Sequence, residues 1–214
     1  MKRLGLDKKP EHNDSAESTS ATVSYITPTE MVDLPSEGKY YEEGHPLYNT
    51  ESVEIRFMTA KDEDILLNEN YIKNGIAIEK LISNILVDKR IKPDQVLIGD
   101  KNAIILAARI SGYGADYETT VRCPNCKEKA RYEFDLADSD VYRGDNYDDE
   151  HIKLTDSGTF IIEAPLSRME LELRLLRGAD ERFMANLLRS SKKKNKGNNL
   201  ITNQLTRLIV SVDG

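Results

Sequence analysis

The chain has 214 residues and a formal net charge of −7, and 31% of its residues are charged. This acidic balance argues against a general DNA- or RNA-coating protein, which is usually basic. No apolar run approaches the roughly 18 residues that a membrane span needs, and the N-terminal segment lacks the apolar core of a secretory signal. We therefore expect a protein made in the cytoplasm, without a membrane partner.

The first 23 residues are polar and contain hardly any large apolar side chain. We predict that residues 1–23 form a disordered tail, because they cannot bury enough apolar surface to offset the entropy of ordering. A turn-rich approach to the first strand follows, and it contains Tyr40, Tyr41 and Tyr48. Two interpretations stay open for these tyrosines: they pack the loop over the strand, or they contact a partner.

Two stretches of the chain are related by a constant offset of 118 residues. Residues 53–66 and 171–184 share four charged residues at that offset, namely Glu54/Glu172, Arg56/Arg174, Asp62/Asp180 and Glu63/Glu181. Each stretch alternates apolar and charged residues and then changes to a helix start, which is typical of a half-buried strand that leads into a helix. This pattern predicts an internal duplication.

Two helices are predicted between the first repeat and residue 114. Thr59 is a suitable cap for a helix whose first turn is acidic, and apolar residues then recur at helical spacing over 76–86 until Pro93. A second helix, rich in small residues, is predicted within residues 96–111, and Gly112 and Gly114 are expected to end it. We interpret Asp62, Glu63 and Asp64 as charges that complement the helix dipole rather than as a metal site.

The only two cysteines, Cys123 and Cys126, lie in a Cys-Pro-Asn-Cys turn between two alternating segments. This spacing between strands predicts a β-hairpin with a zinc-knuckle-like tip, but structural zinc takes about four ligands. Three alternatives stay open. The tip binds no metal, or it is half of a zinc site that a second knuckle beyond Gly214 or another protomer completes, or it is a redox motif. The last is disfavoured, because a strand rather than a helix follows the first cysteine.

Residues 137–150 are acidic and turn-prone, and they predict a linker. Beyond them we expect short strands, a second repeat helix that starts near Gly178 or Ala179, a lysine-rich loop, and a last helix that includes Leu208 and Ile209. The second copy has no counterpart of the small-residue helix or the hairpin. We therefore expect either a truncated form of a longer protein or a partner that covers the exposed face.

Together these features predict an α+β fold with duplicated strand–helix units, a zinc-ribbon-like Cys-x-x-Cys hairpin and an incomplete second copy. The expected parts are a tail over 1–23, a first repeat over 24–136, a linker over 137–150 and a second repeat over 151–214. Three histidines and no phosphate-binding loop leave no catalytic arrangement to argue for, so no enzyme is expected.

Three runs resemble the hub subunits and hub assembly factors of T4-type bacteriophage baseplates: DLPSEGKYYEEGHPLY, VEIRFMTAKDEDIL and VLIGDKNAIILAARISGYGADYETTVRCPNCKEKARYEFDL. The resemblance implies a hub component or a chaperone-like, non-catalytic assembly factor that binds other hub proteins. It implies the host cytoplasm during assembly and the virion tail baseplate as locations. Chains of that family usually continue to a second Cys-x-x-Cys hairpin, so the resemblance implies a zinc half-site at Cys123 and Cys126.

A competing interpretation is a zinc-ribbon module that binds nucleic acid or acts in transcription. It would need a basic face around the hairpin. Four basic residues do cluster there, but four acidic residues offset them; the set is Arg122, Lys127, Lys129 and Arg131 against Glu118, Glu128, Glu133 and Asp135. Nucleic acid is therefore not expected as a partner, and assembly with further copies of the chain stays open.

Overall fold

The computed structural model describes residues 27–139, 141, 152–194 and 200–213. The N-terminal unit (residues 27–139) contains two strand pairs and four α-helices: β1 (Thr29–Asp33), β2 (Ser52–Arg56), α1 (Ala60–Leu67), α2 (Glu69–Asn74), α3 (Ala77–Ile85), α4 (Ile98–Tyr113), β3 (Asp116–Arg122), β4 (Lys129–Asp135) and the short helix η1 (Leu136–Asp138). The C-terminal unit (residues 152–213) contains β5 (Ile152–Leu154), β6 (Phe160–Glu163), β7 (Glu170–Leu173), α5 (Gly178–Lys194), α6 (Leu200–Leu208) and β8 (Ile209–Val212). The predicted mixture of helices and strands is confirmed.

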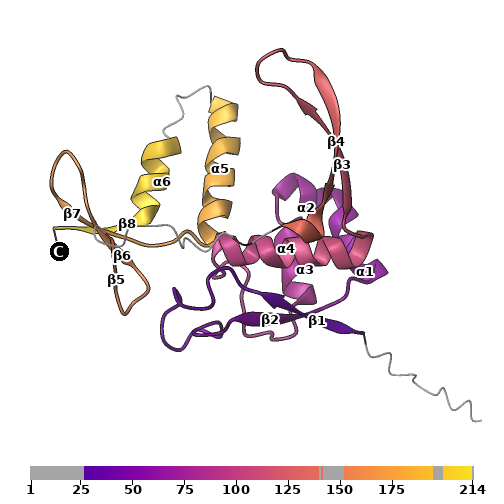
Figure 1. Ribbon diagram of the computed structural model, residues 1–214, viewed down its shortest axis with the longest axis horizontal. Helices are drawn as coiled ribbons and strands as arrows, with labels where there is room; N and C mark the ends of the chain where they lie inside the picture. Colours follow the sequence, from indigo (N-terminus) through magenta and orange to yellow (C-terminus); the bar gives the residue numbers. More distant parts are fainter. Residues whose placement is uncertain (1–26, 140, 142–151, 195–199, 214) are drawn as a thin grey trace, which may run out of the picture.

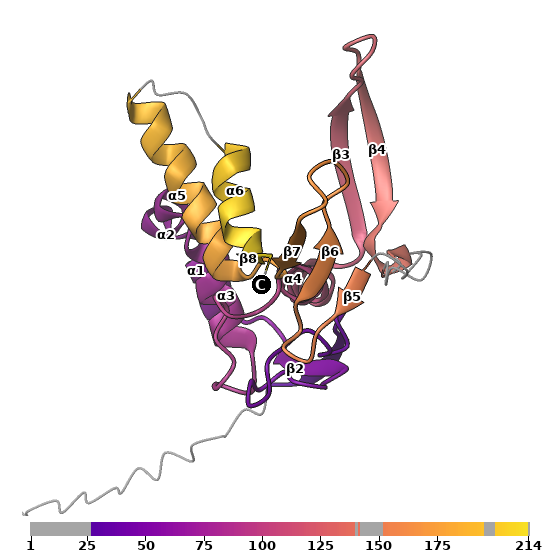
Figure 2. The same cartoon turned by 90° about the vertical axis from the view of Figure 1, so that its left-hand side faces the viewer.

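Among the residues that the structure describes, the strands pair antiparallel and form three separate sheets. The β1–β2 pair lies below α4 in Figure 1, and the β3–β4 hairpin projects away from the body of the molecule. The four-stranded sheet β5-β6-β7-β8 belongs to the C-terminal unit, where α5 and α6 lie side by side (Figures 1 and 2).

The buried core lies in the N-terminal unit. Along β2, Val53 and Ile55 are buried, while Glu54 between them is exposed, as the alternation in the sequence predicts. The helical stripe of α3 packs into the same apolar cluster as β2 and α4; its buried members are Leu81, Ile82 and Ile85 from α3 with Ile104 and Ala108 from α4. Burying one large apolar side chain stabilises a fold by roughly 1.5–3 kcal/mol, so this cluster carries most of the packing energy.

The two units repeat the same local structure. Helix α1 begins at Ala60 and α5 at Gly178, which keeps the offset of the sequence repeat. Each of the preceding strands, β2 and β7, pairs with an earlier antiparallel strand. The nine-residue helices α3 and α6 are both followed by a residue that bridges back to this strand: Leu86 to Ile55 and Ile209 to Leu173. The internal duplication stays a prediction that these equivalent contacts support.

Several predicted boundaries were wrong. The first helical stripe ends at Ile85 rather than at Pro93, because Leu86 is drawn into its bridge with Ile55. Gly112 lies inside α4, and only Gly114 caps it. Ile209 begins β8 instead of continuing the last helix, because its backbone pairs with β7. The predicted tail (1–23), most of the acidic linker and residues 195–199 of the lysine-rich loop lie outside the described residues.

Two glycines of the loop between β1 and β2 share a left-handed backbone conformation but differ in how closely other atoms surround them. Both Gly38 and Gly44 have positive φ, at 73° and 90°. A Cβ at Gly38 would collide with the Thr50 nitrogen and lie 2.5 Å from the Leu47 carbonyl oxygen, whereas one at Gly44 meets nothing within 4 Å. The loop therefore tolerates a side chain only at the second glycine.

We expect Gly44→Ala to lower the free energy of unfolding by about 1–2 kcal/mol, the cost of a left-handed residue with a Cβ. Gly38→Ala should lower it by about 1–3 kcal/mol more, because the added methyl group must displace backbone atoms. Urea denaturation of the two variants measures this difference. Equal losses would mean that the loop moves away from the added methyl group without strain.

Candidate functional site

A buried carboxylate at the start of α4 holds the loop between β1 and β2 against this helix. Asp100 is fully buried and accepts hydrogen bonds from Ser36 N (2.9 Å), Ser36 Oγ (2.6 Å) and Tyr41 Oη (2.7 Å). The Tyr41 hydroxyl oxygen in turn accepts from Leu97 N at 3.0 Å. Burial, and next the charge of Asp100, raise the pKa of Tyr41 above its ordinary value, so its hydroxyl remains a donor.

The segment before α4 also joins the N-terminal unit to the C-terminal unit. Three backbone hydrogen bonds of 2.8–3.0 Å connect the segment to the start of α5: Ile98 N to Leu176 O, Gly178 N to Val96 O and Ala179 N to Asp94 O. Next to them, the buried Lys101 places its Nζ 2.6 Å from a carboxylate oxygen of Glu181. The junction is therefore held by both backbone and side-chain contacts.

The repeated Arg and Asp residues form the same cluster in each unit. Arg56 donates to both carboxylate oxygens of Asp62 at 2.7 and 2.9 Å, and Arg174 does the same to Asp180 at 2.8 Å twice. In each unit the backbone N–H three residues before the aspartate also donates to this carboxylate, from Thr59 at 2.8 Å and from the equivalent Arg177 at 3.0 Å. These clusters close the turn from strand to helix, so the predicted structural role of Asp62 fits its contacts.

The ionisation of both aspartates follows from these contacts. Burial raises the pKa of Asp62, but the hydrogen bonds from Arg56 and Thr59 outweigh it, so the pKa lies well below the ordinary value. Burial also raises the pKa of Asp180, and the hydrogen bonds from Arg174 and Arg177 lower it by more. The pKa of this carboxyl is therefore lowered as well. Both carboxylates are therefore ionised at neutral pH.

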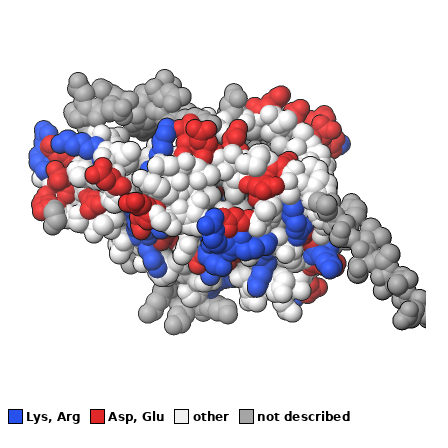
Figure 3. All heavy atoms as spheres, turned by 90° about the horizontal axis from the view of Figure 1, so that it is seen from below, with Lys and Arg blue, Asp and Glu red and all other residues white. Residues whose placement is uncertain are grey.

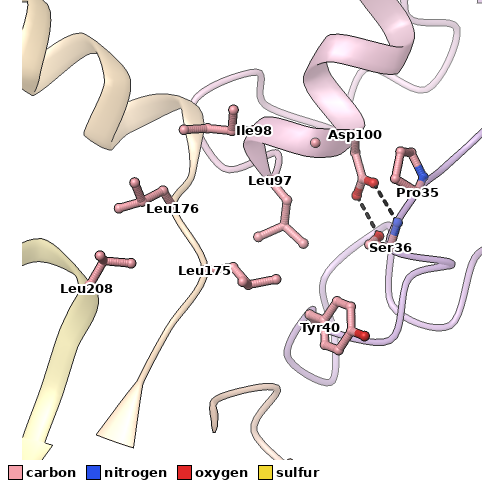
Figure 4. Close-up of a pocket in the computed structure, with 10 residues that line it drawn as sticks. Pro35, Ser36, Tyr40, Leu97, Ile98, Asp100, Leu175, Leu176 and Leu208 are labelled. Atoms are coloured by element: carbon pink, nitrogen blue, oxygen red, sulfur yellow. Dashed lines mark hydrogen bonds between the residues drawn. The ribbon is translucent and has the colours of Figure 1, made fainter. Parts of the chain in front are cut away.

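A cavity of about 480 Å³ lies between the start of α4 and the C-terminal unit (Figure 4). Leu97 and Leu175 line it in the middle of this view, and Leu176 and Leu208 line it on the left. The Asp100 carboxylate that borders it is already occupied by Ser36 and Tyr41. Its lining is thus mainly apolar, which suits an apolar side chain of a partner better than a charged substrate.

The three tyrosines that were candidates for partner contact differ in their surroundings. Tyr41 is fully buried, so its predicted role in partner contact is wrong: its ring lies in the core and its hydroxyl serves Asp100. Tyr40 is half-buried, and its ring centroid lies 5.3 Å from that of Phe160 in the C-terminal unit. Tyr48 keeps an exposed ring. Of the two interpretations of this loop, packing accounts for Tyr41, and partner contact stays a prediction for Tyr48 and Tyr40.

The predicted hairpin is present as β3 and β4 (Figure 1). Cys123 and Cys126 lie in the turn that joins the two strands. Both thiols are free, and the turn is closed by hydrogen bonds between Cys123 N and Glu128 O (2.9 Å) and between Lys127 N and Cys123 O (3.0 Å). Two thiols suit one half of a tetrahedral zinc site. Within the described part of the chain, no group of three or more His, Cys, Asp or Glu residues is placed to hold a metal ion. The zinc-ribbon part of the predicted fold is therefore not supported.

Positive and negative side chains are mixed on the surface. On the face that Figure 3 shows, Lys and Arg residues lie among Asp and Glu residues rather than in a region of one sign. On the hairpin, Arg131 pairs with Glu118, which lies diagonally across from it on the neighbouring strand. A nucleic-acid site would need an uninterrupted basic face, so this distribution does not favour one. Among the described residues, no helix has the length and apolar character to cross a membrane.

Sequence reasoning missed the buried Ser36–Asp100 contact. Ser36 lies in the turn-rich approach to the first strand, and Asp100 follows Gly99 without the Lys-Ser/Thr pair of a phosphate-binding loop, so neither residue stands out in the sequence. The available signal was the position of Asp100 in the first turn of a helix, where a carboxylate is favourable. Its partner, 64 residues away, could not be identified without the tertiary structure.

Comparison with known proteins gives one match. The profile of a family described as T4 bacteriophage base plate protein matches residues 27–209, which is most of the chain and includes both units. No curated protein and no solved structure matches the chain.

Proposed function

This chain belongs to the T4 bacteriophage base plate protein family, and from this membership we propose that it is a hub component or hub assembly factor of the tail baseplate. Membership makes it a phage baseplate protein with a structural role, whose partners are other baseplate proteins. The finer assignment to the hub, action during assembly in the host cytoplasm and the absence of catalysis are parts of the proposal. The following contacts support a role in binding proteins.

The outer face of α6 is the observation that carries this proposal. In the N-terminal unit, Ile82 of α3 is fully buried in the cluster that includes Ile104 and Ala108 of α4. The equivalent residue of α6, Leu205, is 48% exposed, and Ile201 on the same helix is 76% exposed. None of the α6 residues that the structure describes is buried. Uncovered apolar residues of this kind mark interaction sites on soluble proteins.

The repeat also indicates what would cover this face. In the N-terminal unit the cover is α4, whose small residues Ala103, Ala107 and Ala108 all lie in or against the buried cluster. Small residues allow a helix to approach its neighbour closely. Leu208, at the end of α6, also lines the cavity beside α4, so the helix face and the cavity form adjacent apolar surfaces. The proposed occupant is therefore an α4-like helix of another baseplate protein.

The double substitution Ile201→Ser and Leu205→Ser tests this proposal. We expect binding to the hub proteins of the same phage to weaken by at least tenfold, because each apolar contact that is central to an interface contributes more than about 1 kcal/mol. The fold should remain, since the core of the chain lies in the N-terminal unit. Binding is measured with the purified hub proteins of the phage, and function by restoring baseplate assembly in phage that lack this chain.

Gln204→Ser is the matched control, because it changes an exposed polar residue of the same helix. It should bind and assemble as the unchanged chain does. Normal assembly and binding with the double variant would exclude the α6 face as the surface. Complete baseplates in phage without this chain would contradict the role in the hub itself.

A further inference from the structure

The β3–β4 hairpin is amphipathic and extends beyond the body of the protein in both views (Figures 1 and 2). The register places Tyr117 opposite Phe134 and Thr119 opposite Tyr132. Side chains that face each other across two strands share one face, and alternate residues share it too. One face therefore carries these residues together with Val121 and Ala130, and the other carries charged residues such as Glu118 and Arg131.

The apolar face of the hairpin is not covered by the rest of the chain as the structure describes it. Every residue of β4 is exposed, and in β3 only Thr119 is half-buried. The rings of Tyr132 and Phe134 stack on each other, with centroids 6.2 Å apart, and both remain exposed. A two-stranded hairpin is only marginally stable in water unless its apolar face packs against something. This face therefore requires a partner.

The tip of the same hairpin presents two sulfur atoms in one place. The Lys127 N–H closes the turn by donating to Cys123 O at 3.0 Å, and the last paired residues of the two strands are Arg122 and Lys129. Both cysteines therefore lie within one tight turn, three residues apart, beyond the paired part of the hairpin. This arrangement suits a soft divalent metal that prefers thiolates. It supplies two ligands, and structural zinc takes four.

We propose that two copies of this chain bind one zinc ion between their hairpin tips, through Cys123 and Cys126 of each copy. Four thiols release their protons to the solvent and bind the ion as thiolates in a tetrahedral Cys₄ site. The hairpins run side by side about a two-fold axis, and their apolar faces cover each other.

A second copy fits both requirements of the hairpin at once. A symmetric contact pairs the same surface of each subunit, so each tip receives the two thiolates that it lacks. Each aromatic face likewise meets an identical aromatic face, and such pairs stabilise contacts beyond the area that they bury. A partner that is not a copy would have to supply both a thiolate pair and an apolar strand face in matching register.

Zinc content and molecular mass, measured together, test the proposal. The whole chain is purified under reducing conditions, which exclude disulfides, and is loaded with zinc. We expect one zinc ion for two chains and a dimeric mass, and a chelator should return the chain to the monomer. Cobalt in place of zinc should give the visible absorption of a tetrathiolate site. Cys123→Ser and Cys126→Ser should each abolish metal binding and dimer formation.

Two variants of the hairpin faces refine the test. Tyr132→Ser with Phe134→Ser, on the apolar face, should weaken the zinc-dependent dimer by at least tenfold. Thr120→Ser, on the opposite face, is the matched control and should leave the dimer unchanged. Because the hairpin lies outside the core, circular dichroism should show the same helix content in all variants.

Three outcomes would overturn the proposal: one zinc ion in each monomeric chain, no zinc binding, or a dimer that persists in chelator and in the cysteine variants. These outcomes are independent of the α6 face. A chain that binds hub proteins but no zinc would retain the proposed function and lose this inference.

Discussion

Asp100→Ala is expected to lower the free energy of unfolding by about 3–6 kcal/mol. The substitution removes the acceptor of three buried hydrogen bonds, from Ser36 N, Ser36 Oγ and Tyr41 Oη. Each buried donor that is left unpaired costs roughly 1–3 kcal/mol, and the missing carboxylate leaves a void beside α4. Urea denaturation followed by circular dichroism measures the loss.

Two further variants identify the cause of this loss. Asp64→Ala, which removes an exposed carboxylate in α1, should stay within about 0.5 kcal/mol of the unchanged chain. Tyr41→Phe should lose about 1–3 kcal/mol, because it removes one of the three donors and leaves Leu97 N without its acceptor. If Asp100→Ala lowered the free energy of unfolding as little as Asp64→Ala does, the loop between β1 and β2 would not depend on the Asp100 carboxylate.

Asp62→Ala is expected to lower the free energy of unfolding by about 3–5 kcal/mol, the usual effect of removing one partner of a buried ion pair. Asp62 is fully buried and accepts from Arg56, from the backbone and hydroxyl of Thr59, and from Asn84 Nδ2 at 2.6 Å. Asp180→Ala in the equivalent cluster should cost less. Its carboxylate lacks the hydroxyl donor, and in place of Asn84 it has only Arg207, 3.7 Å away.

The lowered pKa of Asp62 makes the free energy of unfolding depend on pH. The folded pKa of Asp62 is lowered, so its contribution is complete at pH values above its unfolded pKa, near 4. It is lost as the pH falls through the folded pKa. The difference in unfolding free energy between the unchanged chain and Asp62→Asn should therefore be constant from pH 7 to about pH 5 and should shrink below pH 4. A difference that does not change down to pH 2 would mean that Asp62 has no lowered pKa.

Local patterns in the sequence predicted the elements that have a strong period or a strong stop signal. The alternation around Val53 and Ile55 predicted β2, and the Cys-Pro-Asn-Cys turn between alternating segments predicted the hairpin of β3 and β4. These features depend on neighbours in the chain, so the sequence contains their signal. The boundaries at Leu86 and Ile209 were wrong because each residue pairs with a strand more than 30 residues earlier.

The sequence by itself determined the family, the mixed α and β content and the repeated Arg–Asp pairs, because each is recorded in residue identities at fixed spacing. Only the tertiary structure decided which charged and aromatic residues are inside. Asp100 and Tyr41 look like ordinary polar residues of a helix start and a loop, yet both are fully buried. Burial of such groups requires a hydrogen-bond partner distant in the chain, and folding alone brings Ser36, Tyr41 and Asp100 together. Only the tertiary structure likewise decided that the apolar faces of α6 and of the hairpin are uncovered, because the exposure of a face depends on how the rest of the chain packs.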